Sequence, residues 1–333
     1  MKNKLILWAI AFMAMSAVRA QDTKTVDLSK IDPSKLDPEQ IKKMDPEKVK
    51  KVLGENPVLF LKIMDKGKKW EEPAEPAHIV GPIYFVGTKG LCSWLIKTSG
   101  GFILMNTCMP GSGPMIEASI KKLGFKPEDV KLLLVGHAHT DHAGGHAYIK
   151  RVTGAEVAIL DAEQPLLESG GKTDFFYGAY PEFLYEPVKA DRVFKDGEKI
   201  TLGDVTLTAL DTPGHSKGST TYTMDVVDGG KTYKVVFPDG SGVNPGYRVA
   251  VNPSYPGIAD DYRRTFKILG HLKPDISLGS HTEMVGYDAR LARSATEGVK
   301  AWVDPDGYAK SVADARAAFE AQVKAEEAAA AKK

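Results

Sequence analysis

The stretch VGHAHTDHAGG, at residues 135–145, decides how this chain of 333 residues is interpreted. It holds three of the protein's eight histidines, His137, His139 and His142, together with Asp141. Zinc accepts imidazole nitrogen and carboxylate oxygen as ligands, and a turn with donors at alternate positions can direct them to one point. Four donors are too many for one open zinc site if further histidines join them. The stretch therefore indicates two metal ions.

Two more histidines lie in turns that suit metal binding. His215 lies in DTPGHSKGS at residues 211–219, and His281 follows an apolar strand in SLGSHT at residues 277–282. Small residues in such turns let the backbone approach an ion closely. The apolar stretch at 130–135 predicts a buried strand that ends at the histidine cluster, and α/β folds place their chemistry in loops beyond strand ends. We interpret the remaining histidines as surface or supporting residues: His78, His146 and His271.

The composition is that of a globular protein. The formal net charge is +1 and 43% of the residues are hydrophobic, which is enough for a sizeable core. Near-neutral charge gives no electrostatic reason to expect nucleic acid as a partner. Strand-rich segments followed by helical ones occur in both halves of the chain. The predicted fold class is therefore α/β: an αββα sandwich, with two mixed β-sheets packed face to face and helices outside.

The first 20 residues have the pattern of a secretory signal peptide. A charged start precedes an apolar run at residues 5–17, and small residues follow near Ala20. The run is too short for a spanning helix and has no stop-transfer flank. We expect cleavage near Ala20, a periplasmic or secreted protein, and no stable membrane insertion.

Residues 21–77 have a different, lysine-rich and acidic composition. Repeated Asp-Pro signals predict short helices at about 38–43 and 46–53, and the apolar segment 58–63 could dock on the main body. We favour a partly ordered, solubilising extension over an oligomerisation or substrate-gating arm. The expected main domain and the expected C-terminal helix with its charged tail occupy residues 78–308 and 309–333.

The two cysteines of the chain, Cys92 and Cys108, are equally distant from Gly100 in a predicted hairpin turn. At a non-hydrogen-bonded pair of such a hairpin they could form a disulfide in an oxidising compartment. A shift of one residue in register would leave two packed free thiols instead. The sequence is compatible with both outcomes.

The pattern His-X-His-X-Asp-His, followed by a Pro-Gly-His turn and a late strand-end histidine, resembles the metallo-β-lactamase superfamily over roughly residues 79–303. Within it the chain is most similar to class B β-lactamases of subclass B3. YFVGTKGL at 84–91 looks like that group's early strand and loop, SGGKTDF at 169–175 resembles its active-site loop, and NPGY at 244–247 is also similar. No cysteine follows the strand ending at Phe237, where other class B enzymes carry a ligand.

The resemblance implies two Zn²⁺ ions per chain. The first would be held by His137, His139 and His215, and the second by Asp141, His142 and His281. A water shared by the two ions would become a hydroxide nucleophile, with Asp141 helping to orient it. The implied substrate is a small molecule, a β-lactam of the penicillin, cephalosporin or carbapenem type, and its hydrolysis would confer antibiotic resistance.

The resemblance is weakest at the predicted substrate contacts. Ser241, Asn244 and Tyr247 are the candidates, but GSGV at residues 240–243 differs from the usual serine-containing segment of the family.

Asp239 bears on the alternative functions. Lactonase-like and glyoxalase-like relatives use an aspartate near this point to bridge their metals, and FPDG at residues 237–240 resembles that position. A lactonase or a glyoxalase-II-like thioesterase is therefore the alternative to a β-lactamase. We favour a turn-capping Asp239, because β-turns commonly carry Asp. A non-catalytic exported zinc-binding protein ranks last, because structural zinc sites usually close with four ligands.

Overall fold

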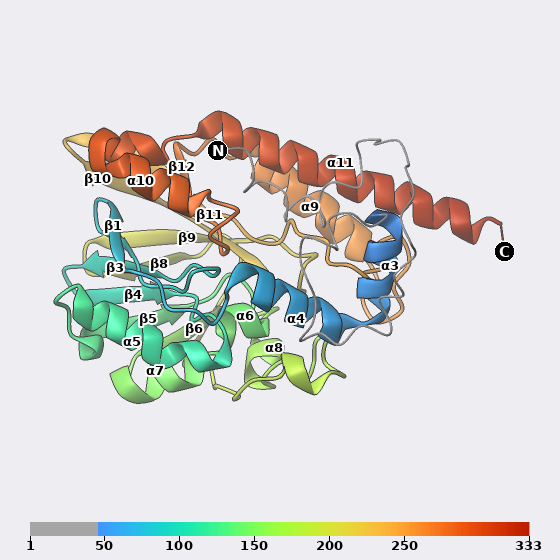
Figure 1. The fold of residues 1–333 in the computed structure, drawn as a ribbon, viewed down its shortest axis with the longest axis horizontal. Helices are drawn as coiled ribbons and strands as arrows, with labels where there is room; N and C mark the ends of the chain where they lie inside the picture. The colour runs from blue at the N-terminus through green and yellow to red at the C-terminus, as the bar shows by residue number, and fades with distance from the viewer. Residues whose placement is uncertain (1–45, 333) are drawn as a thin grey trace.

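The computed structural model describes residues 46–332, except for the side chains at 46–48, 66 and 67, and these residues form an αββα sandwich (Figure 1). The predicted signal peptide at 1–20 and the predicted helix at 38–43 lie outside the described residues. Among the helices that are described, none is long and apolar enough to cross a membrane.

The first sheet, as far as the chain is described, has seven strands in sequence order: β1 (Ala77–Val80), β2 (Ile83–Phe85), β3 (Trp94–Thr98), β4 (Gly101–Met105), β5 (Val130–Leu134), β6 (Glu156–Leu160) and β7 (Arg192–Phe194). Neighbours from β1 to β4 are antiparallel, and those from β4 to β7 are parallel. Parallel neighbours need a crossover connection. The first two parallel crossovers run through α5 (Gly113–Lys122) and α7 (His146–Thr153).

The second sheet has the spatial order β12-β11-β10-β9-β8 over the described residues. Its strands are β8 (Lys199–Leu202), β9 (Val205–Asp211), β10 (Thr220–Asp228), β11 (Lys231–Phe237) and β12 (Ile276–Ser277). Only the pair of β11 and β12 among these described strands is parallel. Both sheets are therefore mixed, as predicted.

Helices cover both outer faces of the sandwich. Figure 1 shows α5 and α7 against the first sheet, and the C-terminal helices on the opposite side. The remaining helices are α3 (Pro46–Glu55), α4 (Pro57–Lys68), α6 (Thr140–Ala143), α8 (Gln164–Glu168), α9 (Ile258–His271), α10 (Tyr287–Glu297), α11 (Pro305–Ala330) and the short 3₁₀ turns η3 (Pro110–Ser112), η4 (Pro127–Asp129), η5 (Pro181–Phe183) and η6 (Gly298–Trp302).

Central strands are buried on both faces, which explains their continuous apolar sequences. In β3, Trp94 and Ile96 pack into the core between the sheets, whereas Leu95 packs into the core beneath the helices. The inter-sheet core continues into the second sheet through alternate residues such as Leu207 and Ala209 of β9. This two-sided burial confirms the predicted sandwich.

The described part of the N-terminal extension, residues 46–77, contains two helices. The predicted helix at 46–53 corresponds to α3, and the segment at 58–63 lies within the longer helix α4. Leu61 and Trp70 are buried in the core that also contains Val86 and Leu91. The described part of the extension is therefore packed onto the body.

Cys92 and Cys108 are both free and buried, so the disulfide is absent from the structure. The β3–β4 ladder pairs Trp94 with Met105, and counting outward places residue 107 rather than Cys108 opposite Cys92. Cys108 also adopts a left-handed backbone with φ of 58°. The two side chains consequently join different apolar cores.

We predict that, without reductant, both thiols titrate with a thiol reagent in denaturant and that neither reacts in the native protein. The reagent attacks the thiolate, and burial raises the pKa of Cys108 to about 12 and that of Cys92 well above its ordinary value. Colorimetric thiol counting with and without denaturant measures both numbers. Absence of titratable thiol in the unfolded, unreduced protein would contradict the structure.

Candidate metal centre

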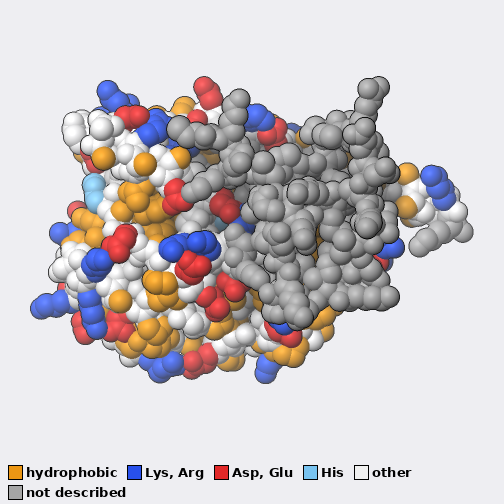
Figure 2. Space-filling view, viewed as in Figure 1, with side chains coloured by type: hydrophobic (Ala, Val, Ile, Leu, Met, Phe, Trp, Pro, Cys, Tyr) orange, Lys and Arg blue, Asp and Glu red, His pale blue; other side chains and the backbone are white. Residues whose placement is uncertain are grey.

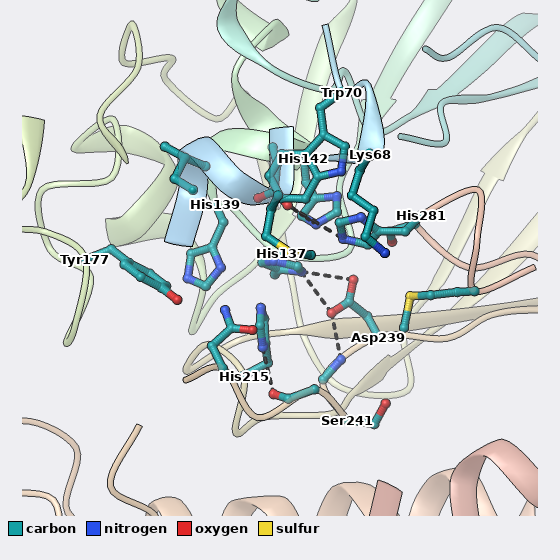
Figure 3. Close-up of a pocket in the computed structure, with 18 of the residues that line it drawn as sticks. Lys68, Trp70, His137, His139, His142, Tyr177, His215, Asp239, Ser241 and His281 are labelled. Carbon is teal, nitrogen blue, oxygen red and sulfur yellow. Dashed lines mark hydrogen bonds and ion pairs between the residues drawn. The ribbon is translucent and has the colours of Figure 1, made fainter. Parts of the chain in front are cut away.

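The histidine cluster lies at the edge of the sandwich where β5 ends. His137 and His139 follow that strand, and α6 carries Asp141 and His142. His215 and His281 arrive from the second sheet, in the turn between β9 and β10 and after β12 (Figure 3). All six predicted ligands line a single pocket.

Three histidines form the first group. One ring nitrogen from each of His137, His139 and His215 lies within 4.8 Å of the others. Their ring centroids are separated by 4.6 Å for His137 and His139, 4.5 Å for His137 and His215, and 4.9 Å for His139 and His215. The structure therefore brings together the set predicted for the first metal.

In each ring of this group, the second nitrogen lies within hydrogen-bond distance of an oxygen atom outside the group. His137 Nδ1 lies 2.9 Å from Asp239 Oδ1, and His139 Nε2 lies 2.9 Å from Asp174 Oδ2. His215 Nδ1 lies 2.7 Å from the carbonyl oxygen of Gly242. These acceptors take the ring N–H, so the opposite nitrogen of each ring is available as a ligand.

Asp141, His142 and His281 form the second group, beside the first. Asp141 Oδ2 lies 3.3 Å from His142 Nε2 and 3.6 Å from His281 Nε2. The rings of His142 and His281 are 5.0 Å apart. The tightest triad that includes Asp141 and His142 is completed by His137 rather than by His281. The two groups thus adjoin, with Asp141 near both.

The charges of four of the six donors suit a metal. Burial, reinforced by neighbouring imidazoles, lowers the pKa of His137 well below its ordinary value and the pKa of His215 and of His281 to about 3. At Asp141 burial acts upward, but His142 and its neighbours outweigh it and hold the pKa below the ordinary range. Neutral imidazole and ionised carboxylate are the forms that bind metals. At His139 burial acts downward on the pKa, but the Asp174 carboxylate outweighs it and raises that pKa.

These residues fit zinc. His137 Nε2 and His142 Nδ1 are buried without a hydrogen-bond partner among the described residues. A cation held by the first group would relieve this costly arrangement at His137, whose Nδ1 already faces Asp239. Five imidazoles and one carboxylate are donors of the type that zinc prefers.

Asp239 lies in the pocket lining and is 9% exposed. Its Oδ1 accepts the N–H of the next residue, Gly240, at 2.6 Å. Both carboxylate oxygens also lie within 3.1 Å of His137 Nδ1. The carboxylate thus contacts the ring nitrogen of His137 that faces away from the first group, a role that the sequence did not indicate.

The predicted substrate contacts divide into two kinds. Ser241 and Asn244 line the pocket. Tyr247 was expected beside them, but it is buried outside the lining and its hydroxyl donates to the His215 carbonyl at 3.1 Å. Its position is that of a support for His215 rather than of a substrate contact.

Glu163 is a buried carboxylate that sequence inspection missed. Its Oε1 accepts the N–H of Ala138 at 2.7 Å, between the first two histidines. Its Oε2 accepts the Ser216 hydroxyl and the Gly218 N–H, each at 2.8 Å, beside His215. Burial raises the pKa of Glu163 to about 7. One side chain therefore joins the two segments that carry the first histidine group.

Comparisons with known proteins agree with this geometry. A family model described as the metallo-beta-lactamase superfamily matches residues 92–281. Native FEZ-1 metallo-beta-lactamase from Legionella gormanii is 41% identical, with 77% of this chain and 98% of that chain covered and a TM-score of 0.75. BJP-1, a subclass B3 metallo-beta-lactamase of Bradyrhizobium japonicum, is also 41% identical, with 79% and 98% covered and a TM-score of 0.73.

Curated relatives are more distant and match a shorter region. A probable metallo-hydrolase from Burkholderia pseudomallei is 31% identical over 34% of this chain and 36% of its own length. The acyl-coenzyme A thioesterase MBLAC2 from Gallus gallus is 32% identical over 26% and 35%. The chain therefore spans about a third of the length of these two relatives.

We predict that Glu163→Gln weakens zinc binding by about tenfold. The side-chain amide nitrogen of Gln cannot accept a hydrogen bond, so at least one of the N–H or hydroxyl donors that now contact Glu163 would lose its acceptor. Competition with a chromogenic chelator measures the dissociation constants. Glu156→Gln, which changes an exposed residue at the start of β6, is the matched control. Equal zinc affinity in the wild type and Glu163→Gln would refute the role assigned to Glu163.

Proposed function

The chain belongs to the metallo-β-lactamase superfamily, and on that premise we propose that it is an exported zinc-dependent hydrolase that opens the β-lactam ring of penicillins, cephalosporins or carbapenems. The observation that carries the proposal is the pair of adjoining donor groups that share one pocket. The likeness to B3 enzymes over nearly their whole length supports the choice of substrate. Such an activity would confer resistance to these antibiotics.

In this proposal His137, His139 and His215 hold one zinc ion, and Asp141, His142 and His281 hold the other. When bound, the metal ions supply a nucleophilic water at neutral pH and polarise the substrate carbonyl. Asp141, which lies near both groups, would accept a hydrogen bond from that water and orient it. Asp239, Asp174 and the Gly242 carbonyl keep the first three imidazoles in their ligating tautomers.

Ser241 and Asn244 act on the substrate rather than on the metal. Both line the pocket next to His215, and each can donate a hydrogen bond. We assign them to the carboxylate or carbonyl groups of the substrate, which positions the ring against the metal centre.

A lactonase or thioesterase activity is the second candidate. The buried Asp239 in the pocket lining favours it, because a carboxylate there could turn toward the metals. The curated relatives named as a thioesterase and, from Dictyostelium discoideum, as "Glyoxylase B2" also support it.

We expect the purified, zinc-loaded protein to hydrolyse at least one of a penicillin, a cephalosporin and a carbapenem, and to lose that activity in a chelator until zinc is restored. An acyl-homoserine lactone and a glutathione thioester complete the substrate panel. Turnover of only the last two would favour the second candidate. Chelator-insensitive turnover, or none on any substrate with zinc present, would rule out the metallohydrolase.

His215→Ala should reduce bound zinc from about two ions to about one and lower kcat/KM at least about a hundredfold, because it removes one of three donors to the first ion. Elemental analysis and initial rates measure the two effects. His271→Ala, a change at an exposed histidine outside both groups, should leave both unchanged. Two tightly bound zinc ions in His215→Ala would contradict the ligand assignment.

A further inference from the structure

Helix α4 forms one wall of the metal pocket, although it lies outside the region that the family model matches. Phe60, Leu61 and Met64 of this helix line the pocket, together with Trp70 just beyond it. The family match begins at residue 92. A segment outside the matched region therefore borders the space in front of the metal ligands.

The wall is held in place at both ends. Before α4, a Cβ atom on Gly54 of α3 would lie only 2.6 Å from the backbone nitrogen of Gly246, so the two backbones are in close contact. At the other end Lys68, the last residue of α4, forms an ion pair with Glu283. Between them Leu61 is buried in the main core. These contacts indicate a fixed wall rather than a loose lid.

The surface that α4 presents is apolar. Three of its four lining residues are the apolar Phe60, Leu61 and Met64. The fourth is Lys68, whose side chain is 2% exposed and forms an ion pair with Glu283. The lining also includes the aromatic rings of Tyr177 and Phe183 from the 161–191 connection. Contact with this apolar wall stabilises a bound ligand only where the ligand presents an apolar group, because binding then removes that group from water.

We infer that α4 selects substrates that carry an aromatic or branched aliphatic group beside the reacting carbonyl. The inference deepens the proposed function and rests on it for the identity of that carbonyl. Phe60 and Met64 are then specificity-determining residues, since they contact the substituent and leave the metal ligands untouched. A helix that only braced the fold would not affect preference between ligands.

Two metal-anchored probes test the wall without requiring turnover. Calorimetry on the zinc-loaded protein compares phenylacetohydroxamate with acetohydroxamate, which lacks the ring. We expect the wild type to prefer the phenyl probe by about tenfold, and Met64→Ala and Phe60→Ala each to reduce that preference by about threefold or more. Met64→Leu, which conserves volume, and Lys62→Ala, on the exposed face of α4, should retain it.

Hydrolysis supplies the second readout. Benzylpenicillin and 6-aminopenicillanic acid share one nucleus, and only the first has an aromatic side chain. The two truncations should lower kcat/KM about threefold or more for benzylpenicillin, through KM, and less than twofold for the bare nucleus. A wild type that retains the probe preference but hydrolyses no β-lactam would refute the proposed substrate and support the wall.

Three results would overturn the inference. The first is a wild type without preference for the phenyl probe. The second is an unchanged preference in both truncated variants. The third is tighter binding of both probes to both variants, which would show that α4 obstructs the pocket rather than selecting its occupant.

Discussion

The metal centre depends on hydrogen bonds that tie the two sheets together at one edge of the sandwich. The N–H of Thr220, at the start of β10, donates to the carbonyl of Gly136 at 2.6 Å. The hydroxyl of Tyr222 donates to the carbonyl of Val135 at 3.0 Å. Both bonds reach from the second sheet to the segment that leaves β5 in the first. They set the spacing between His137, which follows β5, and His215, which precedes β10, because buried hydrogen bonds are costly to break.

Asn106, a residue with a strained backbone, forms a second connection between the two sheets. Asn106 has a left-handed backbone with φ of 64°, which costs roughly 1 kcal/mol for a non-glycine residue. Its Oδ1 accepts the Gly136 N–H at 3.0 Å, and its Nδ2 donates to the Ser280 hydroxyl at 3.3 Å. Asn106 thus connects the segment before His137 to the residue before His281. Together with Glu163, it anchors one backbone stretch to the other two ligand-bearing segments.

Local periodicity predicted the sandwich, and the resemblance of the histidine pattern to a known family implied the six clustered side chains. The supporting residues could not be found in that way. Glu163 is a single acidic residue in no recognisable pattern, and its partners lie 25 to 55 residues away. The Cys92 and Cys108 outcome turned on a register difference of one residue, which tertiary packing determines. Tyr247, a predicted substrate contact, is buried and donates its hydroxyl to the His215 carbonyl, a tertiary contact that no local sequence pattern indicates.

Because of the position of α4, the residues that shape the pocket wall and the residues proposed to bind metal come from different parts of the sequence. The proposed metal ligands lie between residues 137 and 281, within the matched region, whereas one wall of the pocket comes from residues 60–70. Substitutions at Phe60 or Met64 can therefore alter which molecules fit without removing a donor. Changes in α4, whether natural or engineered, can vary ligand preference while the proposed metal ligands at residues 137–281 stay the same.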